Sequence, residues 1–230
     1  MLVRTIFFDL FNTLVSVGEV PVSVGRFTAD ILGLEHEVWN DACFSEHHDI
    51  CQPTVHEDVL RVLAHSVDPS ISDHLIIQAA QERQSRFDHA LHYPRSDVLQ
   101  ALRTLREQEI RLCLISNAST AEVAAWSNSP LAVLFDFAVF SCECGLQKPD
   151  PQIYQYALSN MQAEVSSSLY VGDGGSNEFV GANTVGLRTV MTRQFSKQAR
   201  YEQIREKQGK AIDLEIAHVE EMSSLCGTGP

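Results

Sequence analysis

Short apolar runs recur along the chain, and most of them end at a polar residue. The runs are three to six residues long and do not alternate strictly between apolar and polar positions. Continuous runs of this kind are typical of strands that are buried on both faces, as in a parallel sheet. We interpret five runs as strands and expect the last of them to complete the sheet: residues 3–8, 112–115, 137–140, 169–171 and 189–191.

Segments with helical spacing separate most of these runs. Residues 96–108 form an amphipathic pattern, and residues 119–122 (Ser-Thr-Ala-Glu) have the sequence of a capping box that opens a helix. Asp150 followed by Pro151 predicts the start of another helix, and polar residues 196–210 predict a last one. This alternation predicts an α/β fold with a Rossmann-like, doubly wound parallel sheet covered by helices.

One connection is much longer than the others. Asp9 and Ser116 are separated by 107 positions, which is too long for a simple crossover between neighbouring parallel strands. Within this interval, residues 59–64 and 75–91 carry apolar side chains at helical spacing. We therefore predict a Rossmann-like catalytic core and an inserted helical cap, with the core at residues 1–15 and 93–230 and the cap at residues 16–92.

Polar groups follow the predicted strands directly. Asp9 follows the first strand, Ser116 and Asn117 close the second, and Asp173 follows the fourth. Because the carboxyl ends of parallel strands meet at the edge where open α/β sheets bind ligands, these side chains are expected to face a common site. Taken singly, each has an ordinary explanation, since an Asp that ends a strand is more often a turn or capping residue.

The order of these groups resembles the four signature motifs of the haloacid dehalogenase superfamily. The resemblance covers most of the chain, from residue 3 to about residue 192. It implies a hydrolase in which the inserted helices form a mobile cap that closes over the site, excludes water and selects the substrate. The segments that carry it are Asp9-Leu10-Phe11-Asn12-Thr13, Leu114-Ile115-Ser116-Asn117, Gln147-Lys148-Pro149-Asp150 and Gly172-Asp173-Gly174-Gly175-Ser176-Asn177-Glu178.

The resemblance also implies a role for each matched residue. Asp9 would be the nucleophile that forms an aspartyl phosphate, and Lys148 would balance its charge and that of the substrate. The Ser116 hydroxyl and the Asn117 amide would hold the transferring group. Thr13 and Asn117 are the expected substrate-binding residues. Mg²⁺ prefers hard oxygen ligands, which Asp9, the main-chain carbonyl of Phe11 and Asp173 would supply, with Glu178 acting directly or through water.

Phe11 is the main departure from the family pattern. Phosphatases of this superfamily usually carry a second Asp two residues after the nucleophile, where it protonates the leaving group and later activates water. Phenylalanine can do neither, and loss of a general acid/base typically costs about 10²- to 10⁴-fold in rate. Ordinary alkyl phosphates should therefore be poor substrates unless another group, such as a histidine of the cap, replaces it. A purely structural role, packing against the base of the cap, is the other explanation for Phe11.

Three functions are compatible with these residues. The leading hypothesis is a Mg²⁺-dependent phosphatase that acts on small phosphorylated metabolites. A 2-haloacid dehalogenase-like hydrolase is the alternative, because those enzymes carry an aromatic residue, tyrosine, at the position of Phe11. They are metal-independent, however, and their acidic loop differs from residues 172–178. The third possibility is a catalytically silent binding protein that kept the fold.

Charge and composition narrow the range of partners. The formal net charge of −13 argues against binding to nucleic acids or acidic membranes. Residues 16–92 alone hold thirteen acidic and four basic residues, together with eight of the nine histidines. A solvated acidic helical surface explains this bias. We expect a small-molecule substrate, and a monomer or a homodimer.

Two further features concern the cellular environment. The six cysteines lack the spacing of a disulfide scaffold and are predicted to be free thiols. Arg4 and Asp9 interrupt the N-terminal apolar run, which is therefore interpreted as a strand and not as a signal peptide or a membrane-spanning helix. These features predict a cytoplasmic location.

Overall fold

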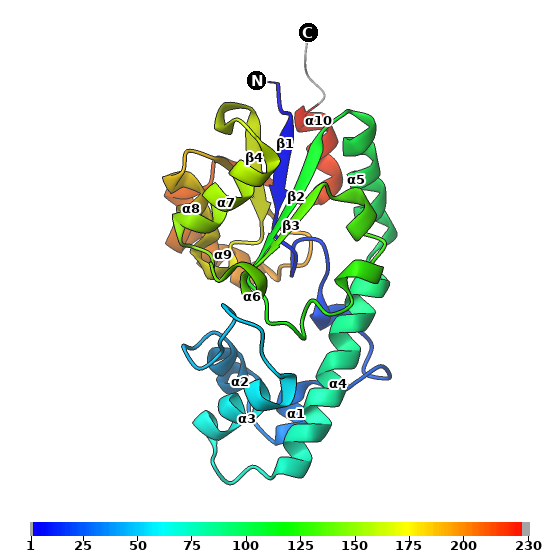
Figure 1. Ribbon diagram of the computed structural model, residues 1–230, viewed down its shortest axis with the longest axis vertical. Helices are drawn as coiled ribbons and strands as arrows, with labels where there is room; N and C mark the ends of the chain where they lie inside the picture. Colours follow the sequence, from blue (N-terminus) through cyan, green and yellow to red (C-terminus); the bar gives the residue numbers. More distant parts are fainter. Residues whose placement is uncertain (1, 227–230) are drawn as a thin grey trace.

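The computed structural model describes residues 2–226 and contains a parallel sheet of six strands in the order β3-β2-β1-β4-β5-β6 (Figure 1). The predicted Rossmann-like α/β fold is confirmed. The chain enters the sheet at its centre, because β1 pairs with both β2 and β4. The strands are β1 (Thr5–Phe8), β2 (Arg111–Ser116), β3 (Phe137–Phe140), β4 (Ser168–Gly172), β5 (Arg188–Thr192) and β6 (Leu214–Ile216).

Helices cover both faces of the sheet, with α5 and α10 on one side and α7 and α8 on the other (Figure 1). The central strand shows why its last three residues are all apolar. Ile6 and Phe8 pack into the cluster on the α5 side, whereas Phe7 packs into the cluster on the α7 side, and all three are fully buried. The helices of this core are α5 (Ser96–Glu107), α6 (Ser141–Cys144), α7 (Pro151–Met161), α8 (Glu178–Thr184), α9 (Gln198–Gln208) and α10 (Met222–Cys226).

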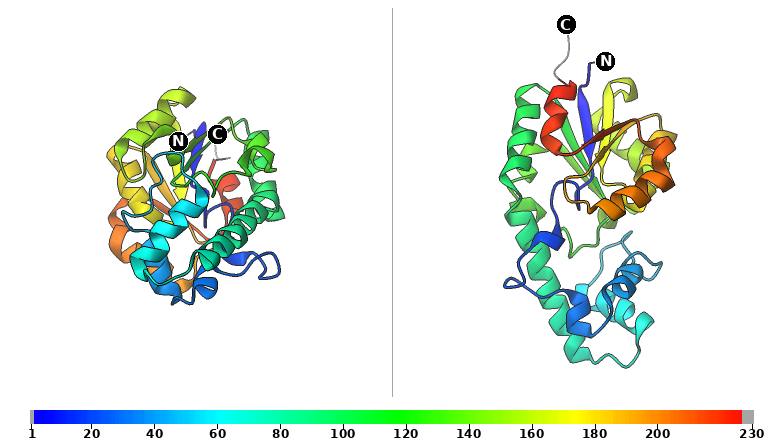
Figure 2. Two further views of the ribbon diagram at one scale, coloured as in Figure 1. Left: turned by 60° about the horizontal axis from the view of Figure 1, so that its bottom comes forward. Right: turned by 180° about the vertical axis from the view of Figure 1, so that it is seen from behind.

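Four helices between β1 and α5 pack mainly against one another, beyond the carboxyl ends of the strands (Figures 1 and 2). Leu60, Leu63 and Ile76 are buried in a hydrophobic cluster that belongs to these helices alone. The 20-residue helix α4 runs from this cluster to the side of the sheet, where Ala90 and Leu91 join the core cluster. The four helices are α1 (Thr28–Leu32), α2 (His36–Cys43), α3 (His56–Val67) and α4 (Asp73–His92).

The helix predicted to start at the capping box does not form, and the chain makes turns there instead. Half of the box is present, because the Ser119 N–H donates to the Glu122 carboxylate at 2.9 Å. Glu122 also pairs with Arg83 of α4 at 2.6 Å. In addition, the Ala121 carbonyl accepts a hydrogen bond from Gln84 of α4 at 2.9 Å. Contacts with α4 thus satisfy groups that a helix would have paired internally, so tertiary structure overrides the local pattern.

The sheet also has one strand more than predicted. β5 was expected to complete it, but β6 pairs along the outer edge of β5. The central residue of β6, Glu215, is polar; it accepts a hydrogen bond from the Tyr201 hydroxyl and pairs with Arg205 of α9 at 3.2 Å. A three-residue edge strand that is covered on one side only leaves no apolar run in the sequence.

The prediction for the cysteines is confirmed, because all six are free thiols. Within residues 2–226, no helix has the length and apolar character that crossing a bilayer requires.

Candidate functional site

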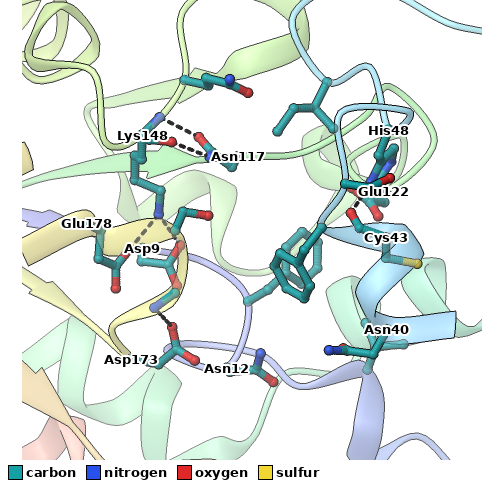
Figure 3. Close-up of a pocket in the computed structure, with 18 of the residues that line it drawn as sticks. Asp9, Asn12, Asn40, Cys43, His48, Asn117, Glu122, Lys148, Asp173 and Glu178 are labelled. Atoms are coloured by element: carbon teal, nitrogen blue, oxygen red, sulfur yellow. Dashed lines mark hydrogen bonds and ion pairs between the residues drawn. The ribbon is translucent and has the colours of Figure 1, made fainter. Parts of the chain in front are cut away.

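Three carboxylates meet at the carboxyl end of the central strands (Figure 3). Asp9 directly follows β1, Asp173 directly follows β4, and Glu178 begins α8 a few residues later. Each contributes one oxygen that lies within 4.8 Å of the other two, and all three residues are buried. These three residues therefore lie close together, as the sequence predicted.

Lys148 lies among these carboxylates and is itself buried (Figure 3). Its Nζ donates to Asp9 Oδ1 at 2.6 Å, to Glu178 Oε2 at 2.7 Å and to the Tyr170 hydroxyl at 3.1 Å. Burial alone would lower the pKa of Lys148, but the negative charges of Asp9 and Glu178 outweigh it and raise the pKa. Lys148 is thus held as an ammonium ion against the predicted nucleophile.

The Asn117 side chain fixes the backbone of Lys148. Asn117 Nδ2 donates to the Lys148 carbonyl at 2.9 Å, and the Lys148 N–H donates to Asn117 Oδ1 at 2.8 Å. This reciprocal pair ties the end of β2 to the segment that carries the lysine. From the sequence, Asn117 was expected to contact only the substrate, and nothing in its local pattern indicated this second contact.

Thr13 holds the other oxygen of Asp9. Its hydroxyl donates to Asp9 Oδ2 at 2.7 Å, and Thr13 is fully buried. The chain folds back to allow this contact through Asn12, which has a left-handed backbone (φ 61°) and whose N–H donates to the Val15 carbonyl at 2.6 Å. Thr13 therefore orients Asp9, and it does not line the cavity described below.

Glu178 accepts hydrogen bonds at both oxygens. Oε2 receives the Tyr170 hydroxyl at 2.7 Å in addition to Lys148, and Oε1 receives the Gly174 N–H at 2.8 Å. Burial raises the pKa of Glu178, with Asp9 and Asp173 adding to the effect and Lys148 opposing it. Every partner at the two oxygens is a donor, which favours the ionised carboxylate.

Negative charge is in excess in this cluster. Burial also raises the pKa of Asp173, with a further contribution from Asp9. Asp173 receives the Gly175 N–H at 2.8 Å, and the guanidinium of Arg200 lies 3.3 Å from its other oxygen. Three buried carboxylates thus lie together with one buried ammonium, which pairs with two of them, and their hard oxygens are the donor type that Mg²⁺ prefers. The residues present therefore fit a divalent cation.

Ser116 closes β2 and is almost fully buried, with 1% of its surface exposed. Its hydroxyl has no hydrogen-bond partner among residues 2–226. A buried hydroxyl without a partner is uncommon in folded proteins. This agrees with a hydroxyl that is free to donate to a substrate oxygen, although the cavity is lined by Asn117 and not by Ser116.

Phe11 faces the inserted helices. Its ring contacts the ring of Phe87 on α4 edge to face, with 5.2 Å between centroids. The guanidinium of Arg83 lies 4.6 Å from the centroid of Phe87 and pairs with Glu122 of the core. The Phe11 side chain thus takes part in the contact between α4 and the core, and it brings no ionisable group to Asp9.

A cavity of about 1080 Å³ separates the sheet edge from the inserted helices. The site at Asp9 and Lys148 lies on one side, whereas Asn40, Cys43 and His48 lie on the other (Figure 3). His48 Nδ1 donates to the Cys43 carbonyl at 2.8 Å, so only Nε2 remains available for another contact. A cap histidine was the expected replacement for the missing acid, and His48 lies in the cavity wall but across from Asp9.

His56 at the start of α3 should make the stability of the protein depend on pH. Burial, helped by the charge of Arg83, lowers the pKa of His56 to about 4, compared with about 6.5 for a histidine in an unfolded chain. The unfolded chain therefore binds the proton first, and the free energy of unfolding should fall as the pH drops from about 6.5 toward 4.

Urea denaturation at pH 7 and pH 5 would measure this effect. His56→Gln should lose less stability over this interval than the wild type. His74→Gln, at an exposed position of α4, is the matched control and should behave like the wild type. An equal loss in His56→Gln and the wild type would show that His56 is not responsible.

The fold and the site together define an α/β protein with an acidic, hydrolase-type centre at the end of its central strands. The family model described as haloacid dehalogenase-like hydrolase matches residues 3–183, which is most of the chain. The chain belongs to this family.

Curated relatives include phosphatases and larger bifunctional proteins. Glyceraldehyde 3-phosphate phosphatase of Methanopyrus kandleri is 23% identical over 205 residues, which cover 84% of this chain and 85% of the relative. Bifunctional epoxide hydrolase 2 of Rattus norvegicus is 29% identical over 108 residues, which cover 45% of this chain but 19% of that protein. The chain thus spans about a fifth of the length of that mammalian relative.

Solved structures with the same fold match almost the whole chain. The Bacillus subtilis protein YfnB, in a structure bound to magnesium, has a TM-score of 0.71 and 16% identity, and the match covers 99% of this chain and 100% of that one. The L-2-haloacid dehalogenase of Xanthobacter autotrophicus, with chloropropionic acid covalently bound, has a TM-score of 0.69 and 16% identity, with 100% of both chains covered. These likenesses concern the fold.

Proposed function

We propose that this protein is a Mg²⁺-dependent phosphatase that acts on a small phosphorylated molecule. The observation that carries the proposal is the meeting of Asp9, Asp173 and Glu178, two of which, Asp9 and Glu178, pair with the buried Lys148. Two relatives support it by their names, the glyceraldehyde 3-phosphate phosphatase and a ribulose-1,5-bisphosphate 5-phosphatase of Halopiger xanaduensis. The magnesium bound to YfnB supports the choice of cation.

In the proposed reaction, an oxygen of Asp9 attacks the phosphorus of a phosphate monoester. The bond between phosphorus and the leaving oxygen breaks, and the leaving group takes the electron pair and then a proton from solvent. Water then attacks the phosphorus of the aspartyl phosphate, and the bond to Asp9 breaks, which releases inorganic phosphate and restores the carboxylate. The net change is hydrolysis of one phosphate ester.

The residues of this chain have separate parts in this scheme. Thr13 and Lys148 hold the Asp9 carboxylate in one orientation, each through one of its oxygens. The unpartnered hydroxyl of Ser116 is proposed to donate to a phosphoryl oxygen. The main-chain N–H of Asn117 is proposed to donate to the same group. Mg²⁺ would neutralise charge on the phosphoryl oxygens. Its proposed ligands are Asp9, the Phe11 carbonyl, Asp173 and Glu178.

The inserted helices are proposed to act as the cap, within the boundaries of residues 16–92. They have their own hydrophobic cluster and form one wall of the cavity. Their contacts with the core include the Arg83–Glu122 ion pair and the Phe11–Phe87 ring contact. A lid built in this way can exclude water from the reacting groups when it closes.

Release of phosphate from phenyl phosphate by the purified protein tests the proposal. Turnover should require Mg²⁺ and should stop when EDTA is added. Turnover that persists without any divalent cation would contradict the metal assignment. Failure of the protein to hydrolyse any phosphate ester or acyl phosphate would contradict the phosphatase assignment, and it would favour the dehalogenase or the silent binding protein.

Phe11 leads to a prediction about the leaving group. No proton donor follows Asp9 at this position, so kcat/KM should rise steeply as the pKa of the leaving phenol falls across substituted phenyl phosphates. Alkyl phosphates should react about 10²-fold or more slowly than phenyl phosphate. A plot of log kcat/KM against leaving-group pKa measures this dependence. A flat plot would mean that another residue donates the proton.

Dehalogenation remains the second candidate because of one specific observation. The chain has an aromatic residue two positions after Asp9, and displacement of halide from carbon needs no proton on the leaving group. Halide release from 2-chloropropionate, measured in the presence of EDTA, would favour this candidate over the phosphatase.

A further inference from the structure

Helix α9 presents one face to the cavity. Arg200, Ile204, Lys207 and Gln208 all line it, and they occupy positions i, i+4, i+7 and i+8 of the helix. Residues at this spacing share one side of an α-helix. The cavity therefore has a wall that belongs to the core, in addition to the wall formed by the inserted helices.

This face of α9 is fixed against the acidic loop. Gln208 Nε2 donates to the Gly174 carbonyl at 2.7 Å, and Gln208 is buried. Ile204 packs so closely on Gly174 that a Cβ there would lie 2.2 Å from the Ile204 side chain. Gly174 also has a left-handed backbone (φ 91°), which a glycine adopts without strain. The backbone of α9 is thus held in a fixed position relative to the acidic loop.

Most other cations of the cavity wall already have strong partners. Lys148 is bonded to Asp9 and Glu178, and Arg83 is paired with Glu122 at 2.6 Å. The guanidinium of Arg86 donates to two main-chain carbonyls, each at 2.6 Å, and lies 4.1 Å from the centroid of the Phe27 ring. Its Nε has no partner among residues 2–226, but Arg86 is buried, with 2% of its surface exposed. Lys148 and Arg83 are therefore already ion-paired, and Arg86 is already hydrogen-bonded through both terminal nitrogens.

The two cations of α9, in contrast to these groups, have no strong partner. Lys207 is exposed and makes no hydrogen bond or ion pair within the described part of the chain. Arg200 has a single long contact, 3.3 Å to Asp173, and its buried Nε has no partner among the same residues. Residues 193–210 hold six basic and two acidic residues in a chain with a net charge of −13. Of these basic residues, Arg200 and Lys207 line the cavity, and a locally basic segment of this kind favours an anion.

We propose that Arg200 and Lys207 bind a second anionic group of the substrate, a carboxylate or a second phosphate, apart from the phosphoryl group that Asp9 attacks. The inference rests on the proposed function and names the substrate class more closely. Arg200 lies beside the acidic cluster, and Lys207 lies two helical turns further along, about 10 Å away along the axis. A substrate a few bonds long between its two anionic groups would reach both the nucleophile and α9.

Matched pairs of substrates test this inference. The probes are 3- and 4-carboxyphenyl phosphate, each compared with the corresponding carbamoylphenyl phosphate, which carries a neutral amide instead of the carboxylate. The 2-isomer is left out because its carboxyl group can itself assist departure of the leaving group. In the wild type, at least one of the two carboxylates should have a kcat/KM about tenfold above that of its amide partner at low salt. This ratio should decrease as NaCl screens the interaction. A ratio near one for both isomers would overturn the inference.

Variants locate the effect on α9. Lys207→Gln and Arg200→Gln should each reduce the carboxylate-to-amide ratio toward one. Lys210→Gln is the matched control, because this nearby lysine does not line the cavity, and it should keep the wild-type ratio. A ratio that is unchanged in both Lys207→Gln and Arg200→Gln would assign the preference to another residue.

A binding measurement separates this inference from the proposed function. Carboxyphenyl and carbamoylphenyl phosphonates cannot be hydrolysed, and their dissociation constants can be measured by calorimetry with Mg²⁺ present. A preference for the carboxylate that depends on Lys207 would support the anion site even if no phosphate ester were turned over. Phosphatase activity with equal affinities for the two phosphonates would support the proposed function and overturn the anion site.

Discussion

Asp9→Asn is expected to reduce phosphate release from phenyl phosphate by at least about 10³-fold. An amide of the same shape cannot attack phosphorus in the way a carboxylate does. The fold should survive, because Asn retains an oxygen that can accept a hydrogen bond from Lys148 or Thr13. Steady-state kinetics with Mg²⁺ measures the loss, and circular dichroism with urea denaturation checks the fold.

Asp150→Asn is the control for this substitution. Asp150 caps α7, where its side chain accepts from the Gln152 N–H at 2.8 Å, and Asn is an equally good capping residue. This control also replaces Asp by Asn. Asp150 is close to Lys148 in the sequence but lies outside the acidic cluster. It should keep wild-type activity. Full activity in Asp9→Asn would mean that the nucleophile has been assigned to the wrong residue.

Among the substitutions proposed for this protein, Gly172→Ala should reduce the free energy of unfolding most. A Cβ at this position would lie 2.0 Å from Glu178 Oε1 and 2.7 Å from its Cδ. The Glu178 carboxylate cannot shift without loss, because Lys148, Tyr170 and the Gly174 N–H all donate to it. Breaking a buried ion pair typically costs about 3 kcal/mol or more. We expect a decrease of about 3 kcal/mol in the free energy of unfolding, with loss of activity.

Urea denaturation at pH 7 measures this decrease. Gly209→Ala is the matched control, because no atom lies within 4 Å of a Cβ built there and the backbone has a φ of −53° that any residue adopts. That variant should be as stable as the wild type. Wild-type stability in Gly172→Ala would show that the Glu178 network can relax at little cost.

The central strands of the core could be predicted from the sequence for a simple reason. Strands buried on both faces are mostly apolar, so β1 and β2 each contain a continuous apolar run, residues 6–8 and 112–115. The groups that follow them, Asp9 and Asn117, must meet at one edge because parallel strands end there together. Convergence of the acidic residues thus follows from topology once the strands are identified.

Other parts depended on contacts that local patterns do not contain. The residues after Ser119 have the sequence of a helix start, but Arg83 and Gln84 of α4 bind the groups that a helix would have used. β6 is too short and too exposed to leave an apolar run. In both cases a partner more than ten residues away in the sequence decided the local structure.

The sequence by itself determined the class of fold and the residues that bring charge to the site, because buried strands and signature groups are local in the chain. The tertiary structure decided how those groups are held. Tyr170 looks like an ordinary strand residue, yet its hydroxyl bonds both Lys148 and Glu178. Arg200 lies in a polar helix without a motif, and only the packing of α9 on the acidic loop places it beside Asp173. Such contacts arise when segments that are distant in the sequence pack together, so the spacing of residues along the chain cannot predict them.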